Sequence, residues 1–214
     1  MSSLSYQPEC VFPDPAEADE NGLLAAGGNL QPQTLLNAYH RGIFPWYEED
    51  GPILWWSPDP RMVLFPGDFH CSRRLARRMR QSDMHISMDA EFSAVVAGCA
   101  QRPEGTWIFP EMVQAYQRLF DLGYARSVEV WQGGALVGGL YGVHIGRIFF
   151  AESMFSRVTD ASKVALAELV RLAQNEGWLM IDCQFHTEHL ASLGAVQIPR
   201  SRFLEVLAEG VDVA

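Results

Sequence analysis

SVEVWQGGALVGGLYGVHIGRIFFAESMFS, residues 127–156, contains three apolar, β-type segments in close order, which are SVEVWQ, GGALVGGLYGVH and GRIFFAESMFS. Turn residues separate these segments at Gly133-Gly134 and at Ile145-Gly146. Short turns that contain glycine, placed between β-type segments, are typical of hairpins. The stretch therefore predicts three consecutive antiparallel strands.

The residues after this stretch predict a long helix, a buried strand and three shorter elements. The helix is expected at about 159–176, before Gly177. Its apolar side holds Leu166, Leu169, Val170 and Ala173. The run WLMIDCQF, residues 178–185, predicts a strand that is buried on both faces. A short helix in TEHLASLG, a strand in AVQI and a helix in RSRFLEVLAEG follow.

The residues before this stretch predict two strands and three helices. The strand RMVLF begins at Arg61, a helix follows at about 71–81, and a short strand lies near 85–88. Two further helices are expected at about 89–100 and 110–122. This order of elements predicts an α/β fold with a mixed sheet. It resembles the architecture of the N-acetyltransferase superfamily, whose members pass acyl groups to amines, and that analogy concerns the fold alone.

The first 60 residues are acidic and rich in proline and glycine, with nine acidic residues and one arginine, Arg41. A helix is expected at 32–41, with Pro32 near its start and Gly42 at its end. In the next segment, GIFPWYEEDGPILWWSPDPR, three tryptophans lie among prolines. We expect this segment to be irregular, without a regular element.

The composition restricts the class of protein. The chain has 214 residues and a formal net charge of −10. No apolar run reaches the roughly 18–20 residues that a membrane helix needs, and the N-terminus lacks the features of a secretory signal, so a cytoplasmic location is expected. The four cysteines form no CxxC pair, which argues against a zinc site or a disulfide framework. We expect a monomer without cofactor or metal ion.

Five of the eight residues 73–80, RRLARRMR, are arginines, which we call the arginine helix. They are Arg73, Arg74, Arg77, Arg78 and Arg80. The planar guanidinium suits phosphate better than the point charge of lysine does. A basic helix on an acidic protein therefore predicts a local contact with a polyanion such as RNA.

The segment IDCQ, residues 181–184, is a candidate for chemistry. On a strand, Asp182 and Gln184 project to one face and Cys183 to the other. The acid can accept a proton or orient the amide, and the amide can hold an amine or an oxyanion. The alternative is a structural aspartate that satisfies backbone donors.

Glu152 interrupts the apolar strand 148–155 and is a second candidate. A carboxylate there requires a partner, which is either a substrate cation or an internal ion pair. Strict alternation would place Phe150, Glu152 and Met154 on one face of the strand and Phe149 on the other.

Aromatic residues are candidates for stacking on unpaired nucleotides. Trp107 and Tyr116 belong to GTWIFPEMVQAY, and Trp46 lies in the proline-rich segment. The alternative for each of them is a place in the hydrophobic core.

Two classes of protein can be weighed against these candidate residues. A coenzyme A-dependent N-acetyltransferase would hold a pyrophosphate on a loop that contains glycine before the long helix, and the loop SRVTDAS, residues 156–162, has none. A non-enzymatic RNA-binding module would not need Asp182, Gln184 or Glu152.

Ten segments run in order from residue 22 to about 195, and they are GLLAAGGNL, LLNAYHRGIFPW, ILWWSPDPR, GTWI, AYQRL, VGGLYGV, FFAESMFSR, ASKVAL, IDCQ and HLASLGA. In these segments the chain resembles the leucyl/phenylalanyl-tRNA–protein transferase family. The resemblance implies a small N-terminal domain, residues 1–60, and an acetyltransferase-like domain, residues 61–214. It implies transfer of Leu, Phe or Met from aminoacyl-tRNA to proteins that begin with Arg or Lys, which marks those proteins for degradation.

The resemblance also implies roles for individual residues. Asp182 and Gln184 fall on the catalytic positions, and Glu152 falls on an acid at the reacting end. Trp46 and Trp107 fall near the terminal adenosine, with Tyr116 nearby. The apolar pocket for the amino-acid side chain comprises Phe149, Met154, Leu166, Leu169 and Ile181. The arginine helix falls where basic residues contact the acceptor stem. His186 and Thr187 depart from a Leu-Asn pair of some relatives, and Ala173 replaces a larger apolar residue.

Overall fold

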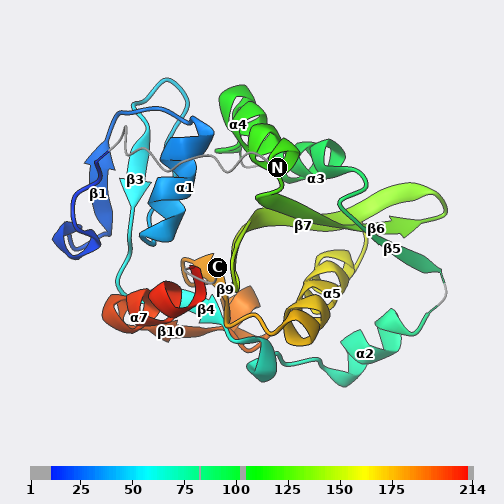
Figure 1. Ribbon diagram of the computed structural model, residues 1–214. Coiled ribbons are helices and arrows are strands. Elements are labelled where there is room, and N and C mark those ends of the chain that lie inside the picture. The colour runs from blue at the N-terminus through cyan, green and yellow to red at the C-terminus, as the bar shows by residue number, and fades with distance from the viewer. Residues whose placement is uncertain (1–10, 82, 102–104, 212–214) are drawn as a thin grey trace.

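The computed structural model describes residues 11–81, 83–101 and 105–211, and Figure 1 shows its two sheets and the helices around them. The strands are β1 (Leu23–Ala26), β2 (Phe44–Pro45), β3 (Leu54–Trp56), β4 (Arg61–Leu64), β5 (Met84–Met88), β6 (Ala125–Gln132), β7 (Ala135–Ile145), β8 (Ile148–Ser156), β9 (Met180–Gln184) and β10 (Val196–Ile198). The helices are α1 (Pro32–His40), α2 (Arg73–Met79), α3 (Phe92–Ala100), α4 (Pro110–Asp121), α5 (Ala161–Glu176), α6 (Glu188–Ala191) and α7 (Arg200–Val211), with 3-10 turns η1 (Pro15–Glu17) and η2 (Pro66–Asp68). The predictions for the first ten residues, Cys10 included, lie outside the described residues.

The larger sheet has seven strands in the order β10-β4-β9-β8-β7-β6-β5. The strands β6, β7 and β8 pair antiparallel with their neighbours in sequence, which confirms the three strands predicted from residues 127–156. The strands β8 and β9 pair in parallel, and α5 connects them. The remaining neighbours are antiparallel, so the predicted α/β class with a mixed sheet is confirmed.

Helices cover both faces of this sheet, with α3 and α4 on one face and α5 on the other (Figure 1). The adjacent residues Phe149 and Phe150 of β8 are fully buried, and each joins a different core cluster. Because side chains alternate along a strand, a sheet that is covered on both faces buries consecutive residues. The same reason explains why all five residues of β9 are buried, as predicted.

The long helix α5 begins two residues later than expected. Asp160 precedes it with a left-handed backbone (φ 67°), and Gly177 ends it in the same conformation (φ 69°). Glycine adopts a positive φ without steric strain, which makes it a common end to a helix. The four residues predicted for the apolar side of this helix are all buried.

The prediction that residues 42–61 lack a regular element is wrong. Part of this segment folds into β2 and β3, which form with β1 a three-stranded sheet in the order β1-β3-β2. Pro45 lies in the edge strand β2, where a residue without an N–H group is tolerated. The buried Trp55 donates its indole N–H to the carbonyl oxygen of Gly27 at 2.8 Å. Short strands with prolines lack the alternating pattern by which strands are predicted.

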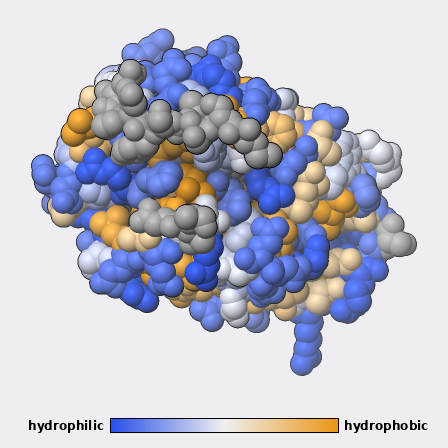
Figure 2. All heavy atoms as spheres, in the orientation of Figure 1, coloured by the Kyte–Doolittle hydropathy of each residue, from blue (hydrophilic) through white to orange (hydrophobic). Residues whose placement is uncertain are grey.

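The small sheet and the large sheet share one hydrophobic core. Leu35 and Tyr39 of α1 and Trp55 of β3 belong to the same cluster of buried residues as Phe150 of β8 and Phe203 of α7. Figure 2 shows apolar atoms at the surface between the N-terminal elements and α7, while hydrophilic atoms cover much of the rest of this face. In the described part of the chain, no helix has the length and apolar character that crossing a bilayer requires.

Candidate active site

Asp182, in the middle of β9, forms a buried ion pair with Arg61 at the start of β4. The Nε and Nη2 atoms of Arg61 donate to the two carboxylate oxygens of Asp182 at 2.8 and 2.7 Å, and both residues are 0% exposed. The guanidinium also donates to the carbonyl oxygen of Gly42, and it lies between the rings of Phe44 and Phe203. A bidentate pair of this kind fixes the position of the carboxylate.

Gln184 is the last residue of β9, and its backbone is left-handed (φ 57°). Its backbone N–H donates to Asp182 Oδ1 at 3.0 Å. Its side-chain Nε2 is buried and has no hydrogen-bond partner among the residues that the structure describes. Asp182 therefore binds the backbone N–H of Gln184. The hydrogen bond expected between the Asp182 carboxylate and the Gln184 side-chain amide is not formed. A strained backbone and an unused buried donor are typical of functional sites.

Glu152 lies at a β-bulge of β8. Tyr141 of β7 is opposite Ser153 and Gly142 is opposite Ala151, so Glu152 is the extra residue. Bulges occur often next to active sites, where they redirect a side chain.

Two tyrosines hold the Glu152 carboxylate. The hydroxyl of Tyr39 donates to Oε1 at 2.6 Å, and that of Tyr116 donates to Oε2 at 2.7 Å. Burial raises the pKa of Glu152 to about 7, although the two tyrosine hydrogen bonds act to lower it. The charge of Asp182 raises this pKa further and that of Arg61 lowers it. Glu152 thus forms hydrogen bonds to phenols in place of the internal ion pair considered from the sequence.

The bulge also changes which residues share a face of β8, so the strict alternation expected there is wrong. Before the bulge Phe150 packs in the first cluster and Phe149 in the second. After the bulge Phe155 packs against the first cluster and Met154 against the second. One extra residue reverses the order of faces. Met154 therefore lies on the side of Phe149, away from Phe150.

The five residues expected to form the apolar pocket all belong to one side of the sheet. The core cluster beneath α5 contains Phe149, Leu166, Leu169 and Ile181, and Met154 packs against it. The first four are buried and Met154 is partly exposed.

The three candidate aromatic residues have different surroundings. Trp46 is 43% exposed and lies beside Trp56 and Phe185, with ring centres 5.5 and 5.7 Å away. Trp107 is partly buried in the segment before α4. Tyr116 is fully buried in α4, so its ring is not open to a base and its hydroxyl contacts Glu152.

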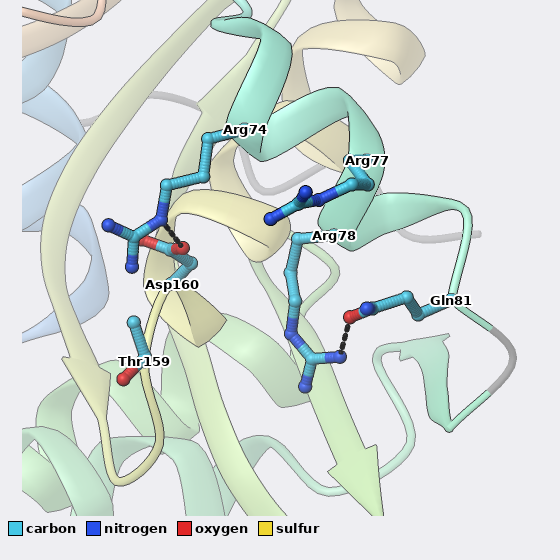
Figure 3. Close-up of a pocket in the computed structure, with 6 residues that line it drawn as sticks. All are labelled: Arg74, Arg77, Arg78, Gln81, Thr159 and Asp160. Carbon is cyan, nitrogen blue, oxygen red and sulfur yellow. Dashed lines mark hydrogen bonds and ion pairs between the residues drawn. The ribbon is translucent and has the colours of Figure 1, made fainter.

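The arginine helix forms α2 and its C-cap, with Leu75 turned into the core. A pocket of about 190 Å³ lies between it and the start of α5. Figure 3 shows Arg74 and Arg77 extended toward Asp160, and Arg78 directed to Gln81. Arg74 pairs with Asp160 at 3.1 Å, and Arg78 pairs with Asp83 at 2.8 Å.

The other three residues of the arginine helix, Arg73, Arg77 and Arg80, form no ion pair with another residue that the structure describes. All three are exposed. They are therefore the members of the arginine helix whose charge is most open to a polyanion.

Cys183 does not contribute a nucleophile. Its side chain is buried in the cluster beneath α5, away from the Asp182 face. Burial raises the pKa of the thiol, which therefore stays protonated near neutral pH.

Two residues of the site were not predicted from the sequence. The sequence places Arg61 only in a strand, and Tyr39 only within the helix expected at 32–41. The pairing of Arg61 with Asp182 could have been predicted. Both charged residues occur in apolar β-type runs, and a buried charge requires a partner. No pattern linked Tyr39 to Glu152, which is 113 residues away.

Comparisons with known proteins give matches over most of the chain. Residues 63–208 match the family model described as leucyl/phenylalanyl-tRNA protein transferase, and residues 28–59 match the model of the N-terminal domain of that family. The leucyl/phenylalanyl-tRNA–protein transferase of Aromatoleum aromaticum is 56% identical over 96% of this chain and 88% of its own length. The protein of the same name from Stutzerimonas stutzeri is 54% identical, over 98% and 92%.

Similarity to solved structures is more distant. A GCN5-related N-acetyltransferase from Kribbella flavida is 13% identical and matches 78% of this chain and 60% of its own, with a TM-score of 0.41. A similarity at this level says nothing about activity.

Proposed function

We propose that this chain, which belongs to the leucyl/phenylalanyl-tRNA protein transferase family, moves Leu, Phe or Met from aminoacyl-tRNA to the N-terminal amine of a protein. We propose acceptors that begin with Arg or Lys and are thereby marked for proteolysis, and a protein that acts as a monomer in the cytoplasm. The observation that best supports the activity is the buried side-chain Nε2 of Gln184, which has no hydrogen-bond partner in the described part of the chain. Gln184 lies two residues from Asp182, which pairs with Arg61, on the strand next to that of Glu152.

The proposed reaction is the aminolysis of an ester. The nitrogen of the acceptor amine attacks the carbonyl carbon of the aminoacyl ester, the bond from that carbon to the ribose oxygen breaks, and a proton of the amine passes to the ribose oxygen. A free α-amine has a pKa of about 7.7–8.0, so part of it is neutral at physiological pH. The enzyme therefore has to position two reactants more than it has to activate either.

Gln184 is proposed to hold the attacking amine or the oxyanion of the tetrahedral intermediate. Its buried Nε2 has two N–H donors, and no described residue accepts from them. Donors that are fixed in advance stabilise the developing charge. Asp182 is proposed to orient Gln184 through the backbone N–H, because both of its carboxylate oxygens are bound by Arg61. Direct proton transfer to Asp182 would require that ion pair to weaken.

Glu152 is proposed to recognise the cationic side chain of an acceptor that begins with Arg or Lys. Its carboxylate is fixed by Tyr39 and Tyr116. A nearby cation would favour the ionised form and lower the pKa from about 7.

The apolar residues beneath α5 are proposed to accept the amino-acid side chain. Met154 is the partly exposed member of the set, and methionine adapts readily to different shapes. Because a methylene group changes binding by only about 1–3 kcal/mol, such a site would accept Leu, Phe and Met alike.

Trp46 and Trp107 are proposed to contact the terminal adenosine, and the arginine helix the acceptor stem. For Tyr116 we propose an indirect role in substrate binding, through Glu152, since its ring is buried. Recognition through phosphates would be independent of tRNA sequence and dependent on salt.

We also propose the division into residues 1–60 and 61–214. It is supported by the separate sheets, since β3 ends at Trp56 and β4 begins at Arg61. The shared core implies that the two parts fold as one unit.

The deciding experiment measures transfer of labelled Leu from Leu-tRNA to a protein that begins with Arg. The same protein beginning with Asp is the matched acceptor control. Label on the Arg protein alone is expected. Acetylation by acetyl-coenzyme A without Leu transfer, or tRNA binding without transfer, would show that one of the two rival functions is correct.

A further inference from the structure

A second pocket, of about 200 Å³, lies between the end of β8 and the end of α3. It is lined by Gly98, Gln101, Met154, Phe155, Ser156 and Arg157. Met154 is also the partly exposed member of the apolar set proposed to hold the amino-acid side chain. Its neighbour Phe155 packs on the opposite side of the sheet, so the pocket borders the apolar set only at Met154, where β8 ends. A ligand group that reached Met154 from this pocket would lie next to the aminoacyl end of the substrate.

Neutral groups hold the guanidinium of Arg157 in place. Its Nη1 donates to the carbonyl oxygen of Leu136 and its Nη2 to Gln101 Oε1, both at 3.1 Å. The guanidinium carbon lies 5.3 Å from the centre of the Phe155 ring. Arg157 forms no ion pair with any carboxylate in the described ranges. The positive charge is thus positioned but not neutralised.

The packing beneath Arg157 fixes the ring on which it lies. A Cβ atom at Gly98 would come within 2.8 Å of the Phe155 ring, so only glycine lets α3 approach this closely. Phe155 in turn packs against the first core cluster. The cation therefore has a rigid support, and a fixed cation next to a pocket suits an anion.

One loop connects this pocket to the arginine helix. Ser156 and Arg157 line the second pocket, and Thr159 and Asp160 line the first, where Figure 3 shows them opposite the arginines of α2. A single RNA strand that leaves the arginine helix and ends beside Met154 would follow this loop past Arg157.

We propose that Arg157 binds the phosphodiester that joins the aminoacylated terminal nucleoside to the preceding nucleotide. This inference rests on the proposed function. Every aminoacyl-tRNA has this phosphate next to its amino acid, so the contact would be independent of tRNA sequence. A guanidinium matches the geometry of two phosphate oxygens. A cationic acceptor, by contrast, would be repelled from this pocket.

The test compares two substrates, of which only one has this phosphate. Leucyl-adenosine has no phosphate, and the leucylated trinucleotide cytidylyl-cytidylyl-adenosine has this phosphodiester and one more. For Arg157→Gln we expect KM to rise about tenfold for the trinucleotide, with kcat unchanged, because a charge-assisted hydrogen bond is removed. With leucyl-adenosine we expect no change. Arg157→Lys should recover part of the loss, since it keeps the charge.

The matched control is Arg202→Gln, which removes an exposed arginine of α7 that pairs with Glu205. It should leave both substrates unaffected. An equal loss on both substrates would show that Arg157 acts through the fold, and an unchanged KM for the trinucleotide would show that it does not bind the phosphate. Either result overturns the inference.

A binding measurement separates this inference from the proposed function. Fluorescence anisotropy with the unacylated, labelled trinucleotide requires no transfer activity. We expect weaker binding by Arg157→Gln than by the wild type, with a smaller dependence on salt concentration. Equal binding would contradict the inference. Absence of transfer by the wild type, with the difference in binding preserved, would contradict the proposed function alone.

Discussion

The buried ion pair of Arg61 and Asp182 is the polar contact on which the geometry of the candidate active site most depends. It fixes the carboxylate that receives the backbone N–H of Gln184, and it connects β4 to β9. The same guanidinium contacts Gly42 and two aromatic rings. When both charges of an ion pair are buried, removal of one leaves the other without compensation, which strongly destabilises the fold.

Replacing Arg61 by Met should therefore destabilise the protein by about 3–5 kcal/mol, because Asp182 would remain buried without a counter-charge. Urea denaturation measures the change. The double variant Arg61→Met/Asp182→Leu should recover much of the loss, since it leaves no unpaired charge. Arg171→Met, which breaks an exposed pair with Glu168, is the control and should change little. A single variant as stable as the wild type would contradict the role of the pair.

The side-chain amide of Gln184, whose Nε2 has no hydrogen-bond partner among the described residues, gives a second prediction at the scale of the residue. Gln184→Ala should lower the single-turnover rate of transfer about 100-fold at saturating tRNA, which is typical of removing one oxyanion donor. Asp182→Asn should also lower it, because the pair with Arg61 weakens. Cys183→Ala is the control, since its side chain lies on the other face of β9. Near wild-type rates for both variants would show that the catalytic assignment is wrong.

Glu152 gives a prediction about pH. Its pKa is about 7 in the folded protein, above the ordinary 4.5, so the folded state binds the proton more tightly than the unfolded state does. The resulting stabilisation is complete below pH 4.5 and is lost as the pH rises through about 7. The free energy of unfolding of the wild type, minus that of Glu152→Gln, should therefore fall over this interval. A difference that is constant with pH would contradict the raised pKa.

At the scale of the element, the arginines of the arginine helix fall into two groups according to whether they form an ion pair. Arg74 and Arg78 are paired with aspartates, while Arg73, Arg77 and Arg80 have no such partner in the described part of the chain. An arginine must give up its ion pair before it binds phosphate fully, so the three unpaired residues should contribute more to tRNA binding.

Replacing Arg73, Arg77 and Arg80 together by Gln should weaken binding of every tRNA to a similar extent. The slope of log K against log salt should become shallower by about 0.9 for each duplex phosphate that the protein no longer neutralises. The control replaces Arg171 and Arg202, which lie on α5 and α7. Unchanged affinity at low salt would contradict a role of the arginine helix in binding tRNA.

At the scale of the whole molecule, the two sheets depend on a common core. Tyr39 of α1 contacts Glu152 of β8, and Arg61 contacts Gly42 and the ring of Phe44. These contacts cross the boundary at residue 60. The small sheet has three short strands, and its buried residue Trp55 belongs to the cluster that also contains Phe150 and Phe203 of the larger part.

We therefore expect the chain to unfold in urea in one transition. The unfolding transition followed by tryptophan fluorescence, to which Trp46, Trp55 and Trp56 contribute, should coincide with the transition followed by far-ultraviolet circular dichroism. The fragment 61–214 should fail to show cooperative unfolding, because Arg61 would lose Gly42 and Phe44, and Phe150 would lose Tyr39. Two separate transitions, or a stable fragment, would contradict a shared core.

Much of the larger sheet could be predicted because its signals are local. The glycine turns at 133–134 and 145–146, and the continuous apolar run of β9, depend on residues that are close in sequence. The strands β2 and β3 could not be predicted, since they have only two and three residues, lie among prolines and are defined by their pairing. The bulge at Glu152 cannot be recognised in the sequence pattern. For this reason Met154 was expected on the wrong face of β8.

The sequence by itself determined the order of the main elements, the α/β class, the arginine helix and the positions of Asp182, Gln184 and Glu152, because periodicity and local composition encode them. Only the tertiary structure decided what these side chains contact. Arg61 binds Asp182 across 121 residues of chain, and Tyr39 binds Glu152 across 113. No local pattern encodes such pairs. They form because folding brings buried polar groups together, and each buried polar group requires a partner.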